Sequence, residues 1–239
     1  EKIQSAFNRD PSNIAIRLLL ARIQVVESDY QVAIDLLTEV KDQNDLPTAY
    51  WKILGQSFIK SNQLRPATSH YDAWLAIEPN NKDAVVGKLL LLDSQNKFAE
   101  ASLLTQGYLN NRDDMQMQLL KVHFLLMQGD YSDAQKAYDA LPVNLLGLPL
   151  AKSFMARFQL NNKQPELALE NALVAYNASP NNRNLRLLLF TYDFLKQTDE
   201  SMELLKKHVE KQSTDLGAKM LLAERQMVGD STAAMVTYE

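Results

Sequence analysis

A small residue recurs along the chain at almost constant spacing, and this regularity limits the fold more than any other feature of the sequence. The intervals are 34, 34, 33, 34, 34 and 32 residues, and one member of the series is not alanine. The series comprises Ala33, Ala67, Ala101, Ala134, Ala168, Met202 and Ala234. A period of this length predicts stacked structural repeats, because each repeat buries its apolar face only against its neighbours.

Residues 48–79 show what one repeat contains. Apolar and small residues recur there at helical spacing in two stripes, and a polar break at residues 61–63 separates them. The first stripe comprises Trp51, Leu54, Gly55 and Phe58, and the second comprises Ala67, Tyr71 and Trp74. The pattern predicts a helix, a tight turn and a second helix.

The order of tryptophan, leucine-glycine and aromatic, then alanine, aromatic and proline, resembles the tetratricopeptide (TPR) repeat. The resemblance implies an all-α fold, a right-handed superhelical solenoid of TPR-like antiparallel helix pairs. Residues 1–239 would form one solenoid, with about six full repeats that start near residues 14, 48, 82, 115, 149 and 183. A partial repeat is expected at each end, so the chain is interpreted as a fragment of a longer protein.

Turn residues support this division into repeats. Gly129 is followed by Asp130, and Gly229 is followed by Asp230, which predicts a left-handed residue and then a helix N-cap. Asn62 and Asn96 take the place of the glycine. Asparagine is the next residue type that adopts this conformation. In the sixth repeat, Met202 and Lys206 stand where alanine and an aromatic residue are usual.

Composition argues against several classes of function. The chain has a net charge of −4, with acids and bases interspersed, whereas nucleic-acid binding requires a clustered basic face. It has no cysteine, and its three histidines show no metal-ligand or catalytic spacing, so no enzyme activity, cofactor or metal is expected. No apolar run approaches the roughly 18 residues of a membrane span.

The TPR resemblance also implies a ligand-binding groove. In TPR-like proteins, the first helix of each repeat lines this groove with its second, fifth, ninth and twelfth or thirteenth residues. Transferred to this chain, the groove residues are Arg22, Lys52, Gln56, Lys60, Asp83, Asp93, His123, Met127, Ser153, Arg157, Asn184, Thr191 and Lys219. Asp83 and Val86 argue against the clamp of basic and amide groups that binds a terminal carboxylate in one TPR subfamily.

The predicted function is a protein–protein interaction scaffold that binds a segment of a protein or peptide partner. Arg22, Lys52 and Lys60 would form a basic patch that attracts an acidic residue or a carboxyl terminus. Degenerate repeats and Asn-Asn turns resemble long bacterial envelope TPR proteins, such as the TPR lipoproteins associated with PEP-CTERM sorting and exopolysaccharide assembly. A periplasmic or envelope location is therefore favoured over the cytoplasm.

Two other classes of function remain open. One is an architectural spacer or self-assembly module, and the other is a regulatory arm of an enzyme whose catalytic domain lies outside this chain. End-to-end self-association is a related prediction, because incomplete repeats expose apolar surface. The residues expected at the two ends are Ile3, Phe7, Ala233, Ala234 and Met235.

Overall fold

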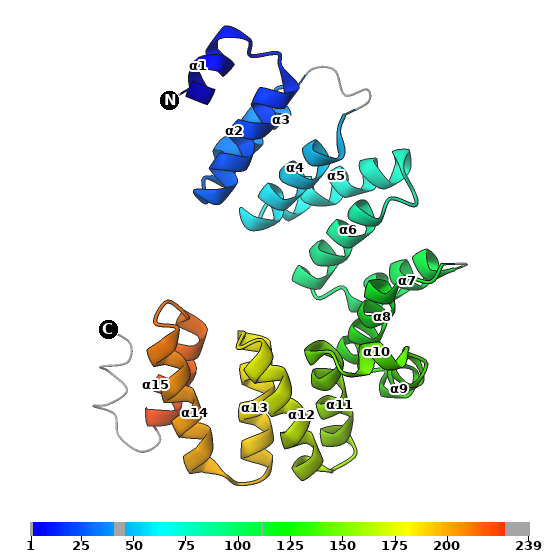
Figure 1. Ribbon diagram of the computed structural model, residues 1–239, viewed down its shortest axis with the longest axis vertical. Helices are drawn as coiled ribbons and strands as arrows, with labels where there is room; N and C mark the ends of the chain where they lie inside the picture. The colour runs from blue at the N-terminus through cyan, green and yellow to red at the C-terminus, as the bar shows by residue number, and fades with distance from the viewer. Residues whose placement is uncertain (1, 41–45, 111, 228–239) are drawn as a thin grey trace. The chain divides into compact units, whose positions relative to one another are not determined.

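The computed structural model describes residues 2–40, 46–110 and 112–227, and within these ranges the chain forms helices and no strand (Figure 1). The chain divides into two compact units, residues 1–117 and residues 118–239. Each unit is described by itself. The expectation of one continuous solenoid over residues 1–239 therefore stays a prediction.

The described part of the first unit contains seven complete helices. They are α1 (Lys2–Arg9), α2 (Ile14–Val26), α3 (Tyr30–Thr38), α4 (Thr48–Lys60), α5 (Leu64–Ile77), α6 (Lys82–Ser94) and α7 (Phe98–Leu109). Helix α8 (Met115–Gln128) begins at the end of this unit and continues into the second. Within the first unit, α2 packs on α3, α4 on α5 and α6 on α7, and each pair packs on the next (Figure 1).

The second unit continues the same arrangement. Its helices are α9 (Tyr131–Asp139), the short α10 (Val143–Leu146), α11 (Pro149–Asn161), α12 (Pro165–Ala178), α13 (Asn182–Phe194), α14 (Thr198–Lys211) and α15 (Leu216–Met227). Helix α11 packs on α12, α12 on α13, α13 on α14 and α14 on α15. The predicted all-α fold of TPR-like helix pairs is confirmed.

A left-handed residue marks the turn between the two helices of each pair. These residues are Ser28, Asn62, Asn96, Gly129, Lys163 and Lys196, with φ between 56° and 87°. The predictions for Asn62, Asn96 and Gly129 are confirmed, whereas Gly229 lies outside the described residues. Five residues after each of the first five turns comes a fully buried alanine: Ala33, Ala67, Ala101, Ala134 or Ala168.

The sixth repeat begins one residue earlier than predicted. Its left-handed residue is Lys196, so the small residue five positions later is Ser201, which is fully buried, and not Met202. Three residues connect α12 to α13, whereas four connect α5 to α6, and this shorter loop moves the helix start to Asn182. Leu205, not Lys206, occupies the usual aromatic position and is fully buried.

Tyr71 fills the space between α4 and α6. Its side chain projects from α5 and is 2% exposed, and burial raises the pKa of its hydroxyl to about 12. Glycines on both neighbouring helices make room for the ring. A Cβ at Gly55 would lie 2.5 Å from the Tyr71 hydroxyl, and one at Gly87 would overlap the ring carbon Cε1. The ring therefore has no free space on the side of either helix.

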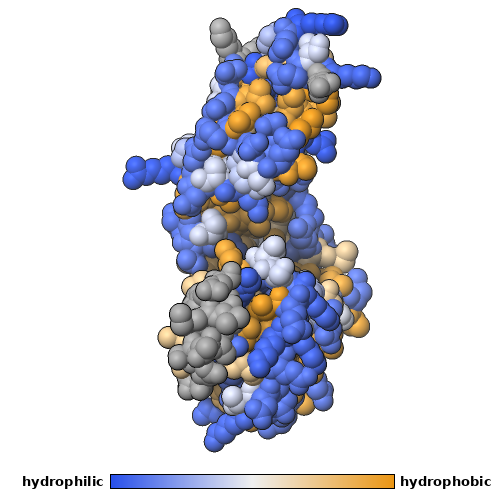
Figure 2. Space-filling view, turned by 90° about the vertical axis from the view of Figure 1, so that its left-hand side faces the viewer, coloured by the Kyte–Doolittle hydropathy of each residue, from blue (hydrophilic) through white to orange (hydrophobic). Residues whose placement is uncertain are grey.

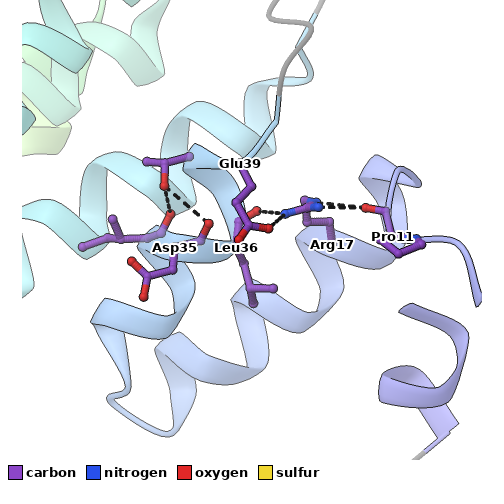
Figure 3. A network of polar contacts seen from close by, with 7 residues as sticks. Pro11, Arg17, Asp35, Leu36 and Glu39 are labelled. Carbon is purple, nitrogen blue, oxygen red and sulfur yellow. Dashed lines mark hydrogen bonds and ion pairs between the residues drawn. The ribbon is translucent and has the colours of Figure 1, made fainter. Parts of the chain in front are cut away.

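The buried Arg17 ties the start of α2 to the end of α3 (Figure 3). Its Nη2 donates to the carbonyl of Pro11 at 2.9 Å, and its Nη1 donates to the carbonyl of Leu36 and forms an ion pair with Glu39 at 2.9 Å. The guanidinium also lies over the Phe7 ring, 5.1 Å from its centroid. The charge of this buried arginine is therefore neutralised within the unit.

Polar side chains also join neighbouring repeats at a separation of about one period. The joints are Gln31 with Gln63 at 2.8 Å, Lys82 with Asp114 at 2.7 Å, Tyr176 with His208 at 2.8 Å, Asn182 with Asp215 at 2.9 Å, and Asp193 with Arg225 at 2.5 Å. Each joint connects a repeat only to the one beside it, as expected for a solenoid.

The structure does not test the predicted end-to-end association. Ile3 and Phe7 on α1 are half-buried. Ala233, Ala234 and Met235 lie outside the described residues. The association therefore stays a prediction.

Candidate functional site

A hollow of about 380 Å³ lies on the first unit, between the first helices of three successive repeats. Helices α2, α4 and α6 each contribute residues to it. Its lining comprises Arg22, Thr48, Ala49, Lys52, Ile53, Gln56 and Asp83. Four of the predicted groove residues, Arg22, Lys52, Gln56 and Asp83, are therefore brought together.

Lys52 and Asp83 form an ion pair across the hollow, with 3.0 Å between the Lys52 Nζ and a carboxylate oxygen of Asp83. The sequence prediction assigned Lys52 to a basic patch and did not include a pair with Asp83. Both side chains are about half exposed, at 48% and 46%. An exposed pair of this kind is worth roughly 0–1 kcal/mol, so a ligand carboxylate competes with Asp83 at small cost.

Two other polar side chains that line the hollow are also exposed to solvent. Arg22 and Gln56 are exposed, and the described residues give Arg22 no hydrogen bond or ion pair. Ile53 adds a buried apolar side chain to the lining. The hollow therefore presents a guanidinium, an amide and a weak ion pair beside an apolar residue, which suits a carboxylate next to an aliphatic group.

Two other predicted groove residues of the first unit lie apart from this hollow. Lys60 is exposed in the last turn of α4 and is not among the lining residues. Asp93 is half-buried near the end of α6 and is also absent from the lining. The predicted basic patch is therefore smaller than expected, with Arg22 and the paired Lys52 at its centre.

Asn184 and Thr191 are not on the exposed stripe of α13, because the helix starts one residue earlier than predicted, although Asn184 is among the lining residues of a hollow at the start of the helix. Both side chains are buried, at 7% and 0% exposed. The Asn184 amide donates to the carbonyl of Ser179 at 2.8 Å, and the Thr191 hydroxyl donates to the carbonyl of Leu187 at 2.7 Å. Neither side chain is exposed as the groove prediction requires, and their polar groups bond the backbone instead.

Ser153 and His123 are also buried, which corrects two further groove predictions. The Ser153 hydroxyl donates to the carbonyl of Leu150 at 2.7 Å, one turn earlier on α11. The ring of His123 packs against Phe124 and Phe154, with centroids 5.0 and 6.2 Å away. Burial in the helix interface therefore removes both side chains from the surface where a ligand would bind.

The exposed stripe of α13 consists of four residues that the sequence analysis missed. Arg183, Arg186, Phe190 and Phe194 occupy the second, fifth, ninth and thirteenth positions of the helix and are exposed. The Asn181 side chain accepts from the backbone N–H of Asn184, and this N-cap signal could have located the helix start. Figure 2 shows apolar surface among hydrophilic side chains on the face in view.

Helix α15 starts one residue later than the groove prediction for Lys219 requires. Lys219 is half-buried, whereas the next residue, Met220, is 51% exposed. Met220 is the fifth residue of α15, which begins at Leu216. The predicted groove position therefore belongs to Met220 and not to Lys219.

Arg157 and Met127 lie together in the second unit. The Arg157 Nη1 donates to the Sδ of Met127 at 3.6 Å. Burial lowers the pKa of the Arg157 guanidinium, the positive charge of Arg183 lowers it further, and Tyr131 acts in the opposite direction. These two predicted groove residues are half-buried and contact each other.

A buried polar network joins α12, α14 and the start of α15. His208 is 2% exposed; its Nδ1 lies 2.8 Å from the Tyr176 hydroxyl, and its Nε2 lies 3.3 Å from Asp215. Burial alone would raise the pKa of Asp215, but hydrogen bonds from the Ala218 N–H, His208 and Asn182 hold it below its usual value. His208 therefore has a structural role, because both of its ring nitrogens contact side chains, one on α12 and one at the start of α15.

The described residues offer neither a metal site nor a membrane-spanning helix. Among the described residues, no group of three or more His, Cys, Asp or Glu side chains is placed to hold a metal ion. In the same part of the chain, every helix is too short or too polar to cross a membrane.

Paired helices, a left-handed turn in each pair and a buried small residue five positions later define the TPR fold. The chain has this fold throughout its described length. It is similar over 99% of its length to the structure of the APC/C hetero-tetramer Cut9-Hcn1, with a TM-score of 0.68 and 13% identity. It spans 47% of that matched chain, or about half its length.

Two smaller TPR structures are similar over most of their own length. PilW, a widely conserved type IV pilus biogenesis factor, matches 89% of this chain and 99% of its own, with a TM-score of 0.66 and 16% identity. YrrB, a TPR protein with an unusual peptide-binding site, matches 81% of this chain and 98% of its own, with a TM-score of 0.56 and 14% identity. No protein-family model and no curated protein matches the chain.

Proposed function

We propose that the chain is a protein-interaction scaffold and that the hollow of the first unit binds an extended or helical segment of a partner protein. The observation that supports this most directly is the meeting of Arg22, Lys52, Gln56 and Asp83 in one hollow. They come from three consecutive first helices, which is where a TPR groove lies. The YrrB structure, described as having a peptide-binding site, supports a peptide as the ligand.

The exposed polar groups favour a segment with a carboxylate near Arg22. Lys52 joins this contact when the ligand carboxylate replaces Asp83, and the released Asp83 then favours a basic residue further along the segment. Each exposed contact contributes roughly 0.2–1 kcal/mol, so we expect micromolar or weaker affinity unless an apolar side chain also contacts Ile53.

A charge-reversal pair tests this site. Arg22→Glu with Lys52→Glu should strongly reduce capture of the partner, because both cations of the hollow are replaced. The matched control is Lys60→Glu with Arg65→Glu, which makes the same charge change on exposed residues outside the hollow. Partners captured from a lysate are identified by mass spectrometry, and the purified partner is then titrated with each variant.

Thermal unfolding completes the test. Exposed substitutions usually change the free energy of unfolding by about 0.5 kcal/mol or less, so all variants should melt together. If the hollow variant binds the partner as tightly as the wild-type chain, the hollow is not the binding site. The spacer or self-assembly role, or a role as the regulatory arm of an enzyme, then becomes the better explanation.

We also propose that the protein acts in a bacterial envelope system, as part of a secretion or exopolysaccharide assembly and as a lipoprotein. The Asn-Asn turns at residues 80–81 and 181–182 and the similarity to PilW, a pilus biogenesis factor, support this proposal. Fractionation of cells that express the full-length protein would test it. Recovery in the cytosolic fraction would contradict an envelope location.

A further inference from the structure

Two helices of the second unit bring arginines together on the side where the first helices of the repeats lie. Arg157 is the ninth residue of α11, and Arg183 and Arg186 are the second and fifth residues of α13. Helices α11 and α13 contact each other, and the charge of Arg183 acts on Arg157. This is a concentration of positive charge on a chain whose net charge is −4.

Arg157 differs from the other arginines that are removed from water. Arg17 is neutralised by Glu39 at 2.9 Å, and Arg225 by Asp193 at 2.5 Å. Among the described residues, Arg157 has only the sulfur of Met127 as an acceptor, and a thioether is a weak acceptor. Withdrawing part of a guanidinium from water without a carboxylate partner costs the free protein some stability.

A hollow of about 610 Å³ lies at the start of α11 and α13 and has both apolar and polar lining residues. Leu119, Leu148 and Leu150 contribute apolar side chains, and Leu148 and Leu150 are 40% and 37% exposed. Arg183 also lines the hollow, so a basic group and an apolar depression share one surface. A ligand that satisfies both must carry negative charge next to a large apolar side chain.

We propose that the second unit binds an acidic segment of a partner protein, with a carboxylate on the guanidinium of Arg157 and a large apolar side chain of the same segment in the hollow lined by Leu148 and Leu150. This site is separate from the Arg22 hollow of the first unit. A peptide fits better than RNA, because RNA requires many phosphate contacts along a basic face. One partly buried arginine beside an apolar hollow recognises a single carboxylate and its neighbour.

The binding test uses a short fluorescein-labelled peptide in which two glutamates are followed by a leucine and a phenylalanine. It is titrated with the full chain, and fluorescence anisotropy is measured at low salt. We expect saturable binding that weakens as salt is added. A matched peptide with glutamine in place of both glutamates should not bind. Arg157→Met should weaken binding about tenfold or more, and Arg157→Lys should retain part of the affinity. Leu150→Asn should weaken binding as well, because it makes the hollow polar.

Two controls separate this site from general charge effects and from the first-unit hollow. Lys206→Gln removes one exposed positive charge from α14 and should bind the peptide like the wild-type chain. The Arg157→Met comparison is repeated in the Arg22→Glu, Lys52→Glu background, where the first-unit hollow has lost both of its cations, and the weakening caused by Arg157→Met should persist there. Failure of the first-unit proposal would therefore not affect this result.

The melting temperature of the free protein distinguishes a ligand-binding arginine from one that only stabilises the fold. Arg157→Met keeps the unbranched stem and removes the charge, so we expect an unchanged or higher melting temperature. A melting temperature several degrees lower would show that Arg157 stabilises the fold, and would overturn the proposal. Two binding results would also overturn the proposal. One is that the glutamine peptide binds as tightly as the glutamate peptide, and the other is that a short single-stranded RNA binds more tightly than the peptide and depends on Arg157.

Discussion

Replacing Gly87 with alanine is expected to lower the free energy of unfolding by about 2–3 kcal/mol, because the added methyl group overlaps the buried ring of Tyr71. The ring cannot move away from α6, since the Tyr71 hydroxyl already lies against Gly55 on α4. Alanine is otherwise the better helix former by about 1 kcal/mol, so helix propensity alone would predict that Gly87→Ala raises the free energy of unfolding. Urea unfolding followed by circular dichroism measures it.

Gly107 on α7 provides a matched control. An added Cβ there meets nothing within 4 Å, so Gly107→Ala should raise the free energy of unfolding by up to about 1 kcal/mol. Combining Gly87→Ala with Tyr71→Leu should cost less than the sum of the two single changes, since the smaller side chain leaves room for the methyl group. Additive losses, or a neutral Gly87→Ala, would show that Tyr71 does not pack against Gly87.

Asp215→Ala is expected to lower the free energy of unfolding by roughly 2–4 kcal/mol, through the loss of an N-cap and of two side-chain partners. The Asp215 carboxylate accepts from the Ala218 N–H at 3.0 Å and from Asn182 at 2.9 Å, and it lies 3.3 Å from the buried His208. The substitution leaves these groups without their acceptor, which adds to the cost of the lost cap.

The effect of Asp215 should depend on pH. Its pKa in the folded protein lies below the usual 3.8, so the unfolded chain binds the proton more readily. The carboxylate therefore stabilises the fold at pH values above 3.8, and this contribution is lost as the pH falls through the lower, folded pKa. The stability difference between wild type and Asp215→Ala should shrink over that acidic range.

Asp215→Asn is the control for this prediction. Asparagine retains an oxygen that caps a helix but removes the negative charge. At neutral pH, Asp215→Asn should therefore lower the free energy of unfolding by less than Asp215→Ala does. A wild-type minus Asp215→Ala difference that stays constant from neutral pH down to about pH 3 would contradict the assigned role.

The repeat could be predicted because the sequence pattern of one helix pair is contained in a short stretch and recurs along the chain. Ala33, Ala67, Ala101, Ala134 and Ala168 mark the helix crossings wherever the loops keep their length. The prediction fails in the sixth repeat because a step of 34 residues was carried across a loop that is one residue shorter. Since each residue turns an α-helix by about 100°, that single residue moves Asn184 and Thr191 from the predicted groove face to the buried side of α13.

Prediction of the site depended on the same register. Arg22, Lys52, Gln56 and Asp83 meet in one hollow, because the first three repeats start where they were expected. Ser153 and Thr191 look accessible in the sequence because they are polar, but each hydroxyl bonds a carbonyl of its own helix. Whether a positive charge such as Arg157 has a carboxylate nearby depends on tertiary contacts that spacing does not reveal.

The joints between repeats have a consequence for how the protein could be rearranged. The five joints use five different pairs of functional groups: two amides, an ammonium with a carboxylate, a phenol with an imidazole, an amide with a carboxylate, and a carboxylate with a guanidinium. Helix pairs with nearly the same backbone are therefore not interchangeable. A permuted chain would separate His208 from the Tyr176 hydroxyl and leave a buried imidazole without its partner. The order of the repeats is thus specified by side-chain chemistry at their boundaries, and a designer who wished to shorten or shuffle this array would have to move the two halves of each joint together.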